Sequence, residues 1–429
     1  MKTNNRTPRL RFPEFTGEWE SPTIAEVFDV RNGYTPSKRA TEYWNGGTIP
    51  WFRMEDIREN GGILADSFQH ITPQAVKGSG LFKKNSIILA TTATIGVHAM
   101  LIADSLANQR FTNFSIRKSL ENKYIPMFVY YAFYGIDEWC KQNTNAGGLL
   151  SVNMPALLKH QFLTPSPAEQ KKIADCLSEM DALIAAQGDK VEALKERKRG
   201  LMQQLFPQQG ETTPRLRFPG FTGDWQEKKF TDCFAILRNN TLSRSQLNYQ
   251  TGKAMNIHYG DILVKFGEVL DIDNKMLPYI TDDATAKRAY RETLNNGDII
   301  IADTAEDETV GKCTEIINIS DTPVVSGLHT IPLRPLFIFA SGYLGYYMNS
   351  KSYRAKLYTL MQGVKVTNIS RSAIQLTNIQ FPPSPAEQEK IAACLMALDE
   401  LITSESAKLE MLKNHKRGMM QQMFPQPTK

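Results

Sequence analysis

The chain contains two of its segments twice. Residues 7–20 read TPRLRFPEFTGEWE, and residues 213–226 read TPRLRFPGFTGDWQ. A second pair lies further along, where residues 165–208 return in closely similar form as residues 383–426. The stretches between the paired segments barely resemble each other. A repeat of this length indicates a duplication of whole domains and not a solenoid, whose repeats run about 20 to 50 residues.

The spacing of the repeats predicts the domain organisation. The first pair of segments is offset by 206 residues (213 − 7) and the second pair by 218 (383 − 165). Each variable stretch therefore has roughly 145 to 155 residues, which is enough for a hydrophobic core of its own. We expect an N-terminal segment with variable domain 1, a helical spacer, a linker with variable domain 2 and a second helical spacer, at 1–164, 165–208, 209–382 and 383–429.

Both helical spacers carry apolar residues at alternating steps of four and three. This alternation is the a/d seam of a coiled coil. The apolar seam positions are Ile173, Leu177, Met180, Ile184, Val191 and Leu194 in the first spacer, and Ile391, Leu395, Leu398, Ile402, Leu409 and Leu412 in the second.

Polar residues interrupt both seams at the same two positions. They are Gln187 and Lys198 in the first spacer, and Glu405 and Lys416 in the second. A polar residue in a seam costs stability and can fix the register and the partner helix. Alternatively, these side chains lie at the edge of the seam and extend into water.

The ends of both helices have sequence signals. Ser166 and Ser384 are natural N-caps, each followed by proline at N1 and glutamate at N3, which is the capping-box pattern. Pro207 and Pro425 end the helices. A helix of about 38 residues is roughly 57 Å long. The first helix leads from domain 1 to domain 2 and the second leads back, so we predict an antiparallel coiled coil with one domain at each end, related by a pseudo-two-fold axis.

The variable domains show short strand-like runs and helical stretches. Apolar runs at 86–91 and 297–304 predict strands, and Gly260–Val264 is interpreted as a turn feeding another strand. Met127–Gln142 and Ile338–Met361 are predicted to be helical. The expected fold class is α+β, with two domains of mixed structure separated by the two long helices.

The composition is that of a soluble globular protein, with 41% hydrophobic and 22% charged residues. No apolar run approaches the roughly 20 residues that cross a bilayer, and the N-terminus lacks the apolar core of a signal peptide. The five cysteines form no CxxC pair, which favours a reducing compartment. We therefore expect a cytoplasmic protein with no membrane contact. A net charge of +5 is weak, so a DNA-binding face would have to come from local clustering.

Several of these motifs resemble the specificity (S) subunits of type I restriction–modification systems. The most specific marks are the two Pro-Ser-Pro-Ala-Glu-Gln helix starts, each of which closes a variable domain. Within the domains, the similar segments are Gly33–Ser37, Tyr43–Trp44 and Ile49–Trp51 in the first, and Tyr259–Ile262 and Gly327–His329 in the second.

The resemblance implies the function. It implies two target-recognition domains, each of which reads one half of a bipartite site in double-stranded DNA. It also implies helices that set the spacing and dock two copies of a methyltransferase subunit, with restriction and translocase subunits joining through the complex. Two reading domains about one DNA turn (roughly 34 Å) apart would lie on one face of the duplex. Because the two domains differ in sequence, the two half-sites should differ.

Loops that mix basic, amide and hydroxyl side chains are the candidates for DNA contact, since these groups bind base edges and phosphates. For Trp51, Tyr34 and Tyr259, packing in the core or at its rim is favoured over stacking on bases. The candidates are Thr35, Ser37, Lys38, Arg39, Arg53, Thr92, Thr94, Asn108, Gln109, Arg110, Asn145 and Asn153 in domain 1, and His258, Tyr259, Lys265, Thr304, Thr309, Lys312, His329, Gln362, Lys365, Thr367 and Asn368 in domain 2.

The sequence shows no catalytic or metal site. It has no GxxxxGK[ST] phosphate loop, and its histidines and cysteines lack metal-ligand spacing. We expect no catalytic residue, metal or cofactor in this chain, and we expect S-adenosylmethionine, ATP and Mg²⁺ to bind partner subunits. Two alternatives are an assembly scaffold whose domains bind proteins, and a hydrolase or transferase with duplicated sites. No nucleophile–base or carboxylate pair repeats at either offset, which counts against the second alternative.

Overall fold

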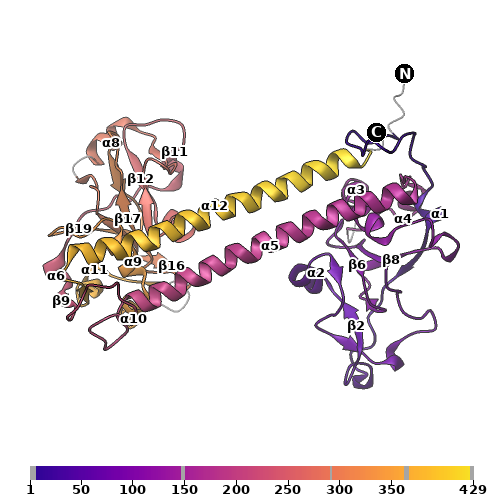
Figure 1. The fold of residues 1–429 in the computed structure, drawn as a ribbon, viewed down its shortest axis with the longest axis horizontal. Helices are drawn as coiled ribbons and strands as arrows, with labels where there is room; N and C mark the ends of the chain where they lie inside the picture. Colours follow the sequence, from indigo (N-terminus) through magenta and orange to yellow (C-terminus); the bar gives the residue numbers. More distant parts are fainter. Residues whose placement is uncertain (1–5, 146–149, 290–291, 362–366, 426–429) are drawn as a thin grey trace. The chain divides into compact units, whose positions relative to one another are not determined.

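The structure is a computed structural model that describes residues 6–145, 150–289, 292–361 and 367–425. The chain forms two compact units. The first comprises Met1–Gln187 with Lys408–Lys429, and the second comprises Gly188–Ala407. Each unit contains one variable domain together with one end of each long helix (Figure 1).

The long helices are α5 (Pro167–Leu205) and α12 (Pro385–Met423), each of 39 residues. In both helices every position of the predicted seam is buried or half-buried. In the first unit the start of α5 shares a hydrophobic core with the end of α12, through Ile173, Leu177 and Met423. In the second unit the end of α5 shares a core with the start of α12, through Leu205 and Leu395. The prediction of antiparallel pairing is thus confirmed within each unit.

The capping-box prediction is only half right. Ser166 Oγ accepts from the backbone N–H of Glu169 at 3.4 Å, as an N-cap should. The carboxylate of Glu169 does not return to the cap, however, because it is bound by Arg11 through Nε and Nη2, both at 2.8 Å. In the second unit, Arg217 binds Glu387 in the same way, at 2.8 and 2.9 Å.

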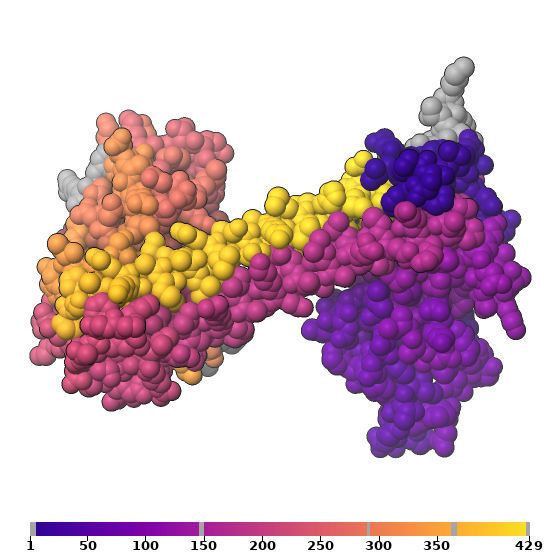
Figure 2. Space-filling view, in the orientation of Figure 1, coloured from indigo at the N-terminus to yellow at the C-terminus, as the bar shows by residue number. Residues whose placement is uncertain are grey.

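These two ion pairs explain why both motifs repeat together. The guanidinium of Arg11 also donates to the carbonyl oxygens of Thr16 and Gly17, and Arg217 donates to the equivalent carbonyls. The arginine of each short motif therefore fastens that motif to the start of a long helix. Leu10 N also donates to Gln422 O at 3.0 Å, and Figure 2 shows the N-terminal residues (indigo) against the end of α12 (yellow).

The first variable domain has two small sheets. Their strand orders are β1-β8-β5-β6-β3 and β4-β2-β7. The helices of this domain are α1 (Ile24–Val27), α2 (Met54–Asn60), α3 (Pro126–Gln142) and α4 (Met154–Lys159), with short 3₁₀ turns at Thr41–Tyr43, Pro73–Ala75 and Lys118–Leu120. The strands are β1 (Phe28–Asn32), β2 (Ile49–Phe52), β3 (Ile63–Leu64), β4 (His70–Ile71), β5 (Ile87–Ala90), β6 (His98–Leu101), β7 (Leu106–Ala107) and β8 (Phe111–Ile116).

The second variable domain has sheets ordered β10-β19-β15-β17-β13 and β11-β14-β12-β18, with two-stranded additions β16-β20 and β21-β9. Its helices are α6 (Phe230–Cys233), α7 (Tyr259–Val264), α8 (Asp283–Ala289), α9 (Tyr343–Asn349), α10 (Lys351–Tyr358) and α11 (Arg371–Ile374), with a 3₁₀ turn at Arg244–Gln246. The strands are β9 (Gln226–Lys229), β10 (Phe234–Ile236), β11 (Leu247–Asn248), β12 (Met255–Ile257), β13 (Val269–Asp271), β14 (Tyr279–Ile280), β15 (Ile299–Ala302), β16 (Thr304–Ala305), β17 (Cys313–Ile317), β18 (Val324–Ser326), β19 (Thr330–Pro335), β20 (Thr367–Asn368) and β21 (Asn378–Phe381).

The two variable domains share one topology despite their different sequences. The strand order of each five-stranded sheet is the same, and the pairing directions agree. The edge pairs β3/β6 and β13/β17 are both parallel, and so are β2/β7 and β12/β18. The predicted α+β class is confirmed, and the registers give a residue-by-residue equivalence between the domains.

One prediction about local structure is wrong and another is only partly right. Gly260–Val264 belongs to helix α7 and not to a strand, because His258 Nδ1 accepts from Gly260 N at 3.3 Å and starts a helix. Ile262 is 0% exposed while Val264 is 83% exposed, whereas residues two apart in a strand share a face. The predicted helix 338–361 is two helices, α9 and α10, because Ser350 ends the first and its side chain caps the second.

Candidate nucleic-acid interface

Several loops meet at one end of the sheets in the first variable domain. Strand β5 ends where β8 begins, with Ala90 opposite Phe111, and β1 ends beside the same point. The parallel strands β2 and β7 end together at Phe52 and Ala107. The loops that follow β1, β2, β5 and β7 therefore share one edge. We call this edge the loop end, and its residues are 33–35, 53, 91–94 and 108–110.

Backbone hydrogen bonds hold the loop end together. Thr91 N donates to Arg110 O at 3.0 Å, and Val152 N donates to Thr91 O at 2.9 Å. Thr35 Oγ1 donates to the side-chain oxygen of Gln109 at 2.5 Å. The structure thus brings together most of the domain 1 candidates, namely Thr35, Arg53, Thr92, Thr94, Asn108, Gln109, Arg110, Asn145 and Asn153.

The side chains of the loop end differ in how far they reach solvent. Gln109 and Arg110 are exposed, while Asn153 is occupied as the N-cap of α4. Arg53 is the N-cap residue of α2, and its Nε lies 3.8 Å from Glu55. The exposed candidates Ser37, Lys38 and Arg39 lie on a separate loop, where Ser37 O accepts from Trp44 Nε1 at 3.0 Å.

The second variable domain has the same loop end. Asp303 N donates to His329 O at 3.1 Å, and Ile369 N donates to Asp303 O at 2.9 Å, as Thr91 and Val152 do in the first domain. The equivalences that follow pair independently predicted candidates. They are Arg110 with His329, Thr92 with Thr304, and Arg53 with His258.

His329 has an unusual backbone for its residue type. Its φ of 53° lies in the left-handed region, which non-glycine residues rarely occupy. Its side chain is 47% exposed, with Nδ1 at 3.4 Å from both the Asp303 carboxylate and the Thr304 hydroxyl. The Tyr259 ring lies between His329, at 5.2 Å, and His258, at 4.6 Å. Burial lowers the pKa of His258, so this imidazole is neutral near pH 7.

The remaining domain 2 candidates have mixed surroundings. Lys265 pairs with Asp261 at 3.0 Å, and this hydrogen bond raises the pKa of Lys265. Lys312 points inward and donates to Leu263 O at 3.1 Å, and burial lowers its pKa. Thr309 donates to Asp307. Thr367 and Asn368 form β20 beside Thr304–Ala305, whereas Gln362 and Lys365 lie outside the described residues.

The structure adds residues that the sequence did not single out. Asn240 N donates to Ser326 O as Tyr34 N donates to Ala107 O, which makes Asn239 the equivalent of Gly33. Asn239 Oδ1 accepts from the exposed Arg371 at 2.7 Å. Only the shared hydrogen-bond pattern reveals these residues, since no sequence motif marks them.

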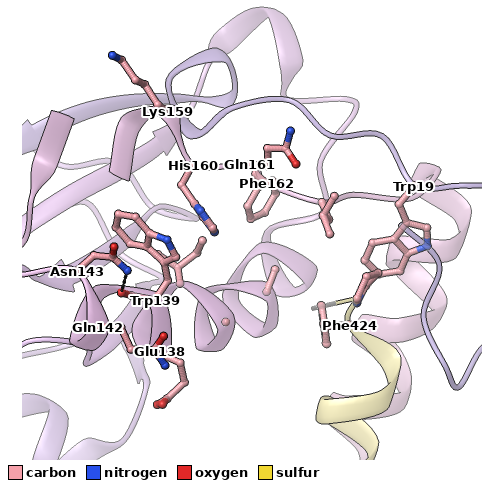
Figure 3. Close-up of a pocket in the computed structure, with 15 residues that line it drawn as sticks. Trp19, Glu138, Trp139, Gln142, Asn143, Lys159, His160, Gln161, Phe162 and Phe424 are labelled. Atoms are coloured by element: carbon pink, nitrogen blue, oxygen red, sulfur yellow. Dashed lines mark hydrogen bonds between the residues drawn. The ribbon is translucent and has the colours of Figure 1, made fainter. Parts of the chain in front are cut away.

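A hollow of about 640 Å³ lies elsewhere in the first unit. Figure 3 shows Trp139 beside His160 on one side and Trp19 beside Phe424 on the other. The Trp139 and His160 rings are 4.8 Å apart, and burial lowers the pKa of His160. None of the lining residues is a DNA-binding candidate, so the hollow is distinct from the loop end.

Within the part of the chain that the structure describes, no group of three or more His, Cys, Asp and Glu side chains could hold a metal ion. No helix among the described residues is long and apolar enough to cross a membrane.

Comparison with known proteins identifies the family. Residues 16–196 and 222–414 each match the type I restriction modification DNA specificity domain. The chain therefore belongs to this family and carries two copies of its domain.

Relatives and solved structures agree with the family. The chain is 44% identical over 171 residues to the type I restriction enzyme EcoprrI specificity subunit of Escherichia coli, a match covering 38% of this chain and 42% of that relative. It is 24% identical over 423 residues to the MjaVIII specificity subunit of Methanocaldococcus jannaschii, covering 96% and 92%. The crystal structure of an S subunit from M. genitalium has the same fold, with a TM-score of 0.54 at 15% identity, covering 98% of this chain and all of that one.

Proposed function

We propose that this chain is the DNA-recognition subunit of a type I restriction–modification complex. Each variable domain reads one half of an asymmetric bipartite site through its loop end, and the paired helices set the spacer between the halves. The observation that carries the proposal is the pair of loop ends, which have the same backbone frame but present different side chains at equivalent positions, such as Arg110 and His329. One frame with two sets of side chains suits two different half-sites.

The side chains suit readout of the major groove. An arginine such as Arg110 can donate two hydrogen bonds to guanine, and an amide such as Gln109 can pair with adenine. Hydroxyl groups and backbone N–H groups of the same loops can bind phosphates and fix the register on the duplex. The strained backbone of His329 supports a role at the DNA, since strained residues concentrate at functional sites.

The catalytic reactions would be carried out by partner subunits and not by this chain. The chain would dock two copies of a methyltransferase subunit on its helices and bind restriction and translocase subunits through the complex. S-adenosylmethionine, ATP and Mg²⁺ would bind those subunits. The alternative of an assembly scaffold with two protein-binding domains is less favoured, because both copies of the family domain are DNA specificity domains.

Selection from random DNA tests the proposal. The chain, purified with its methyltransferase, is offered a pool of random duplexes, and the bound DNA is sequenced at several salt concentrations. We expect enrichment of a split motif and an affinity that falls steeply with salt, because phosphate contacts release counterions. Binding without any enriched motif, or no binding by a folded complex, would favour the scaffold.

A further inference from the structure

The two seam lysines occupy equivalent polar joints. In the first unit, Lys416 of α12 contacts the Asp181 carboxylate of α5 at 2.5 Å. Tyr131 of α3 donates its hydroxyl to the other oxygen of the same carboxylate at 2.8 Å. The Lys416 ammonium also lies 5.2 Å from the centre of the Tyr131 ring. Three elements, two long helices and one domain helix, therefore meet at a single aspartate.

The second unit repeats this arrangement with the helices exchanged. Lys198 of α5 contacts the Asp399 carboxylate of α12 at 2.6 Å, and Tyr346 of α9 donates to the same group at 2.6 Å. The Lys198 ammonium lies 5.3 Å from the Tyr346 ring. Lysine and aspartate both recur at the offset of 218 residues, so each joint takes its lysine from one copy of the helix and its aspartate from the other.

The tyrosines are informative because they come from the variable domains. Those domains differ in most positions, yet each presents a tyrosine, 1% exposed, at the same place on an equivalent helix. Burial raises the pKa of both hydroxyls, so each stays protonated and donates. The lysine side chains are 14% and 13% exposed, so neither extends freely into water as an edge position would allow.

Each joint connects rigidly to a loop end. Helix α3 packs on β6, and Tyr131 belongs to the same hydrophobic core as Phe28 and Phe114 of the large sheet. In the second unit, Gly342 N and Gly345 N at the start of α9 donate to the buried Glu315 carboxylate of β17, at 2.6 and 2.9 Å. A rotation of α3 or α9 on the long helices would therefore carry the sheet and its loop end with it.

We propose that these joints are positioning elements for DNA recognition, which fix the angle of each variable domain on the helix pair and thereby restrict the spacer length that the protein accepts. This inference rests on the proposed function. The joints lie on the long helices and not in the loop ends, so we expect them to act on the distance between the half-sites and not on their sequences. Lys198 also contacts the Glu268 carboxylate of the second variable domain at 2.5 Å, so the second joint holds its domain at two points.

Spacer mapping with matched variants tests the proposal. The full chain carries Lys198→Met or Lys416→Met, or the milder Tyr131→Phe or Tyr346→Phe, and is expressed with its methyltransferase. Lys195→Met and Lys413→Met serve as controls, because these lysines are exposed, lie three residues from the joint lysines and pair within their own helix. Genome-wide methylation then reports both half-sites and every spacer length used.

We expect unchanged half-sites and relaxed spacing. Methylation at sites with one base pair more or less in the spacer should rise about tenfold for the lysine variants, the effect of losing one charged hydrogen bond. Methylation at these altered sites should rise less for the tyrosine variants, and the control variants should methylate the same sites as the original chain. A merely structural role would lower thermal stability without new spacer lengths, and that result would overturn the proposal.

Hydrogen exchange supplies a readout without DNA. Amides of α3 should exchange faster in Lys416→Met, and those of α9 faster in Lys198→Met, while the controls stay unchanged. If neither amide exchange nor the accepted spacer length changed, the proposal that the joints position the domains would be wrong. If the original chain directs no methylation at all but the exchange result holds, the proposed function fails while the joint stands as a structural connection.

Discussion

The two variable domains share the backbone hydrogen bonds of their loop ends, but they differ in the polar groups of their interiors. At the loop ends the backbone hydrogen bonds match, while the side chains at equivalent positions change from Arg53 to the buried His258 and from the exposed Arg110 to His329. The frame is therefore independent of the side chains that it presents. This independence is what a reading domain needs if its target is to change without refolding.

The interiors differ in which equivalent positions hold a buried polar group and in whether that group has a hydrogen-bond partner. Glu315 of β17 occupies the position of Met100 in β6, since each pairs with the first residue of the neighbouring strand. Glu169 accepts from Trp19 Nε1 at 3.3 Å as well as from Arg11, whereas Trp225 Nε1 has no hydrogen-bond partner within the described residues. At these two positions the second unit has a buried polar group that the first unit replaces with methionine or satisfies with a hydrogen bond, so the stability of the two units should respond differently to substitution and to pH.

The largest expected effect comes from exchanging a whole domain. Replacing residues 20–163 with those of a family relative should change one half-site completely and leave the other unchanged, because each loop end is built within its own domain. Methylation mapping of the chimera measures this. A change in both half-sites would contradict the separation of the two domains.

The motif-to-helix ion pairs should rank next. Arg217→Met leaves Glu387, 1% exposed, without its guanidinium, and losing one partner of a buried pair costs about 3 to 5 kcal/mol. Arg11→Met should cost about 1 kcal/mol less, because Trp19 still donates to Glu169. Denaturant titration followed by hydrogen exchange reads each unit separately.

Arg215→Met is the control for this pair, since its guanidinium is exposed and pairs with Glu211 at the surface. It should cost no more than about 1 kcal/mol. If Arg11→Met and Arg217→Met lowered the free energy of unfolding equally, the Trp19 hydrogen bond would not contribute to the stability of the first unit.

The pH dependence should also separate the two units. Burial raises the pKa of Glu315 from 4.5 to about 7. Between these values the folded unit binds a proton that the unfolded chain releases, so the stability of the second unit should fall as pH rises from about 4.5 to 7, by at most roughly 3 kcal/mol. The Glu315→Gln variant should lose this slope relative to the original chain. A slope that survives the substitution would assign it to other groups.

The smallest effect should come from single loop-end residues. Arg110→Ala and His329→Ala should each weaken DNA binding by about 1 to 3 kcal/mol and relax specificity in one half-site only. Competition binding with each half-site varied in turn measures this. Arg117→Ala is the control, because Arg117 follows the opposite end of β8 and donates to Ala25 O. If Arg110→Ala relaxed both half-sites, the assignment of one loop end to one half-site would be wrong.

Sequence reasoning succeeded where a pattern is periodic or repeated. The steps of four and three predicted both long helices, and the order of domains and helices along the chain predicted their antiparallel pairing. It failed at Gly260–Val264, where a side-chain cap from His258 outweighed the strand propensity of an apolar run. The roles of Arg11 and Glu169 were also missed, because their contact spans 158 residues. The equivalence of Arg110 and His329 depends on strand register, which two dissimilar sequences do not reveal.

Methylation mapping tests directly whether the two variable domains read separate halves of a DNA site. The chain is expressed with the proposed methyltransferase subunit in a host that lacks other DNA methylation, and the genome is sequenced with a method that detects N6-methyladenine. We expect a split motif with two different half-sites and an unread spacer of fixed length. A continuous motif would contradict two separate reading domains, and no methylation by folded, associated proteins would contradict DNA recognition itself.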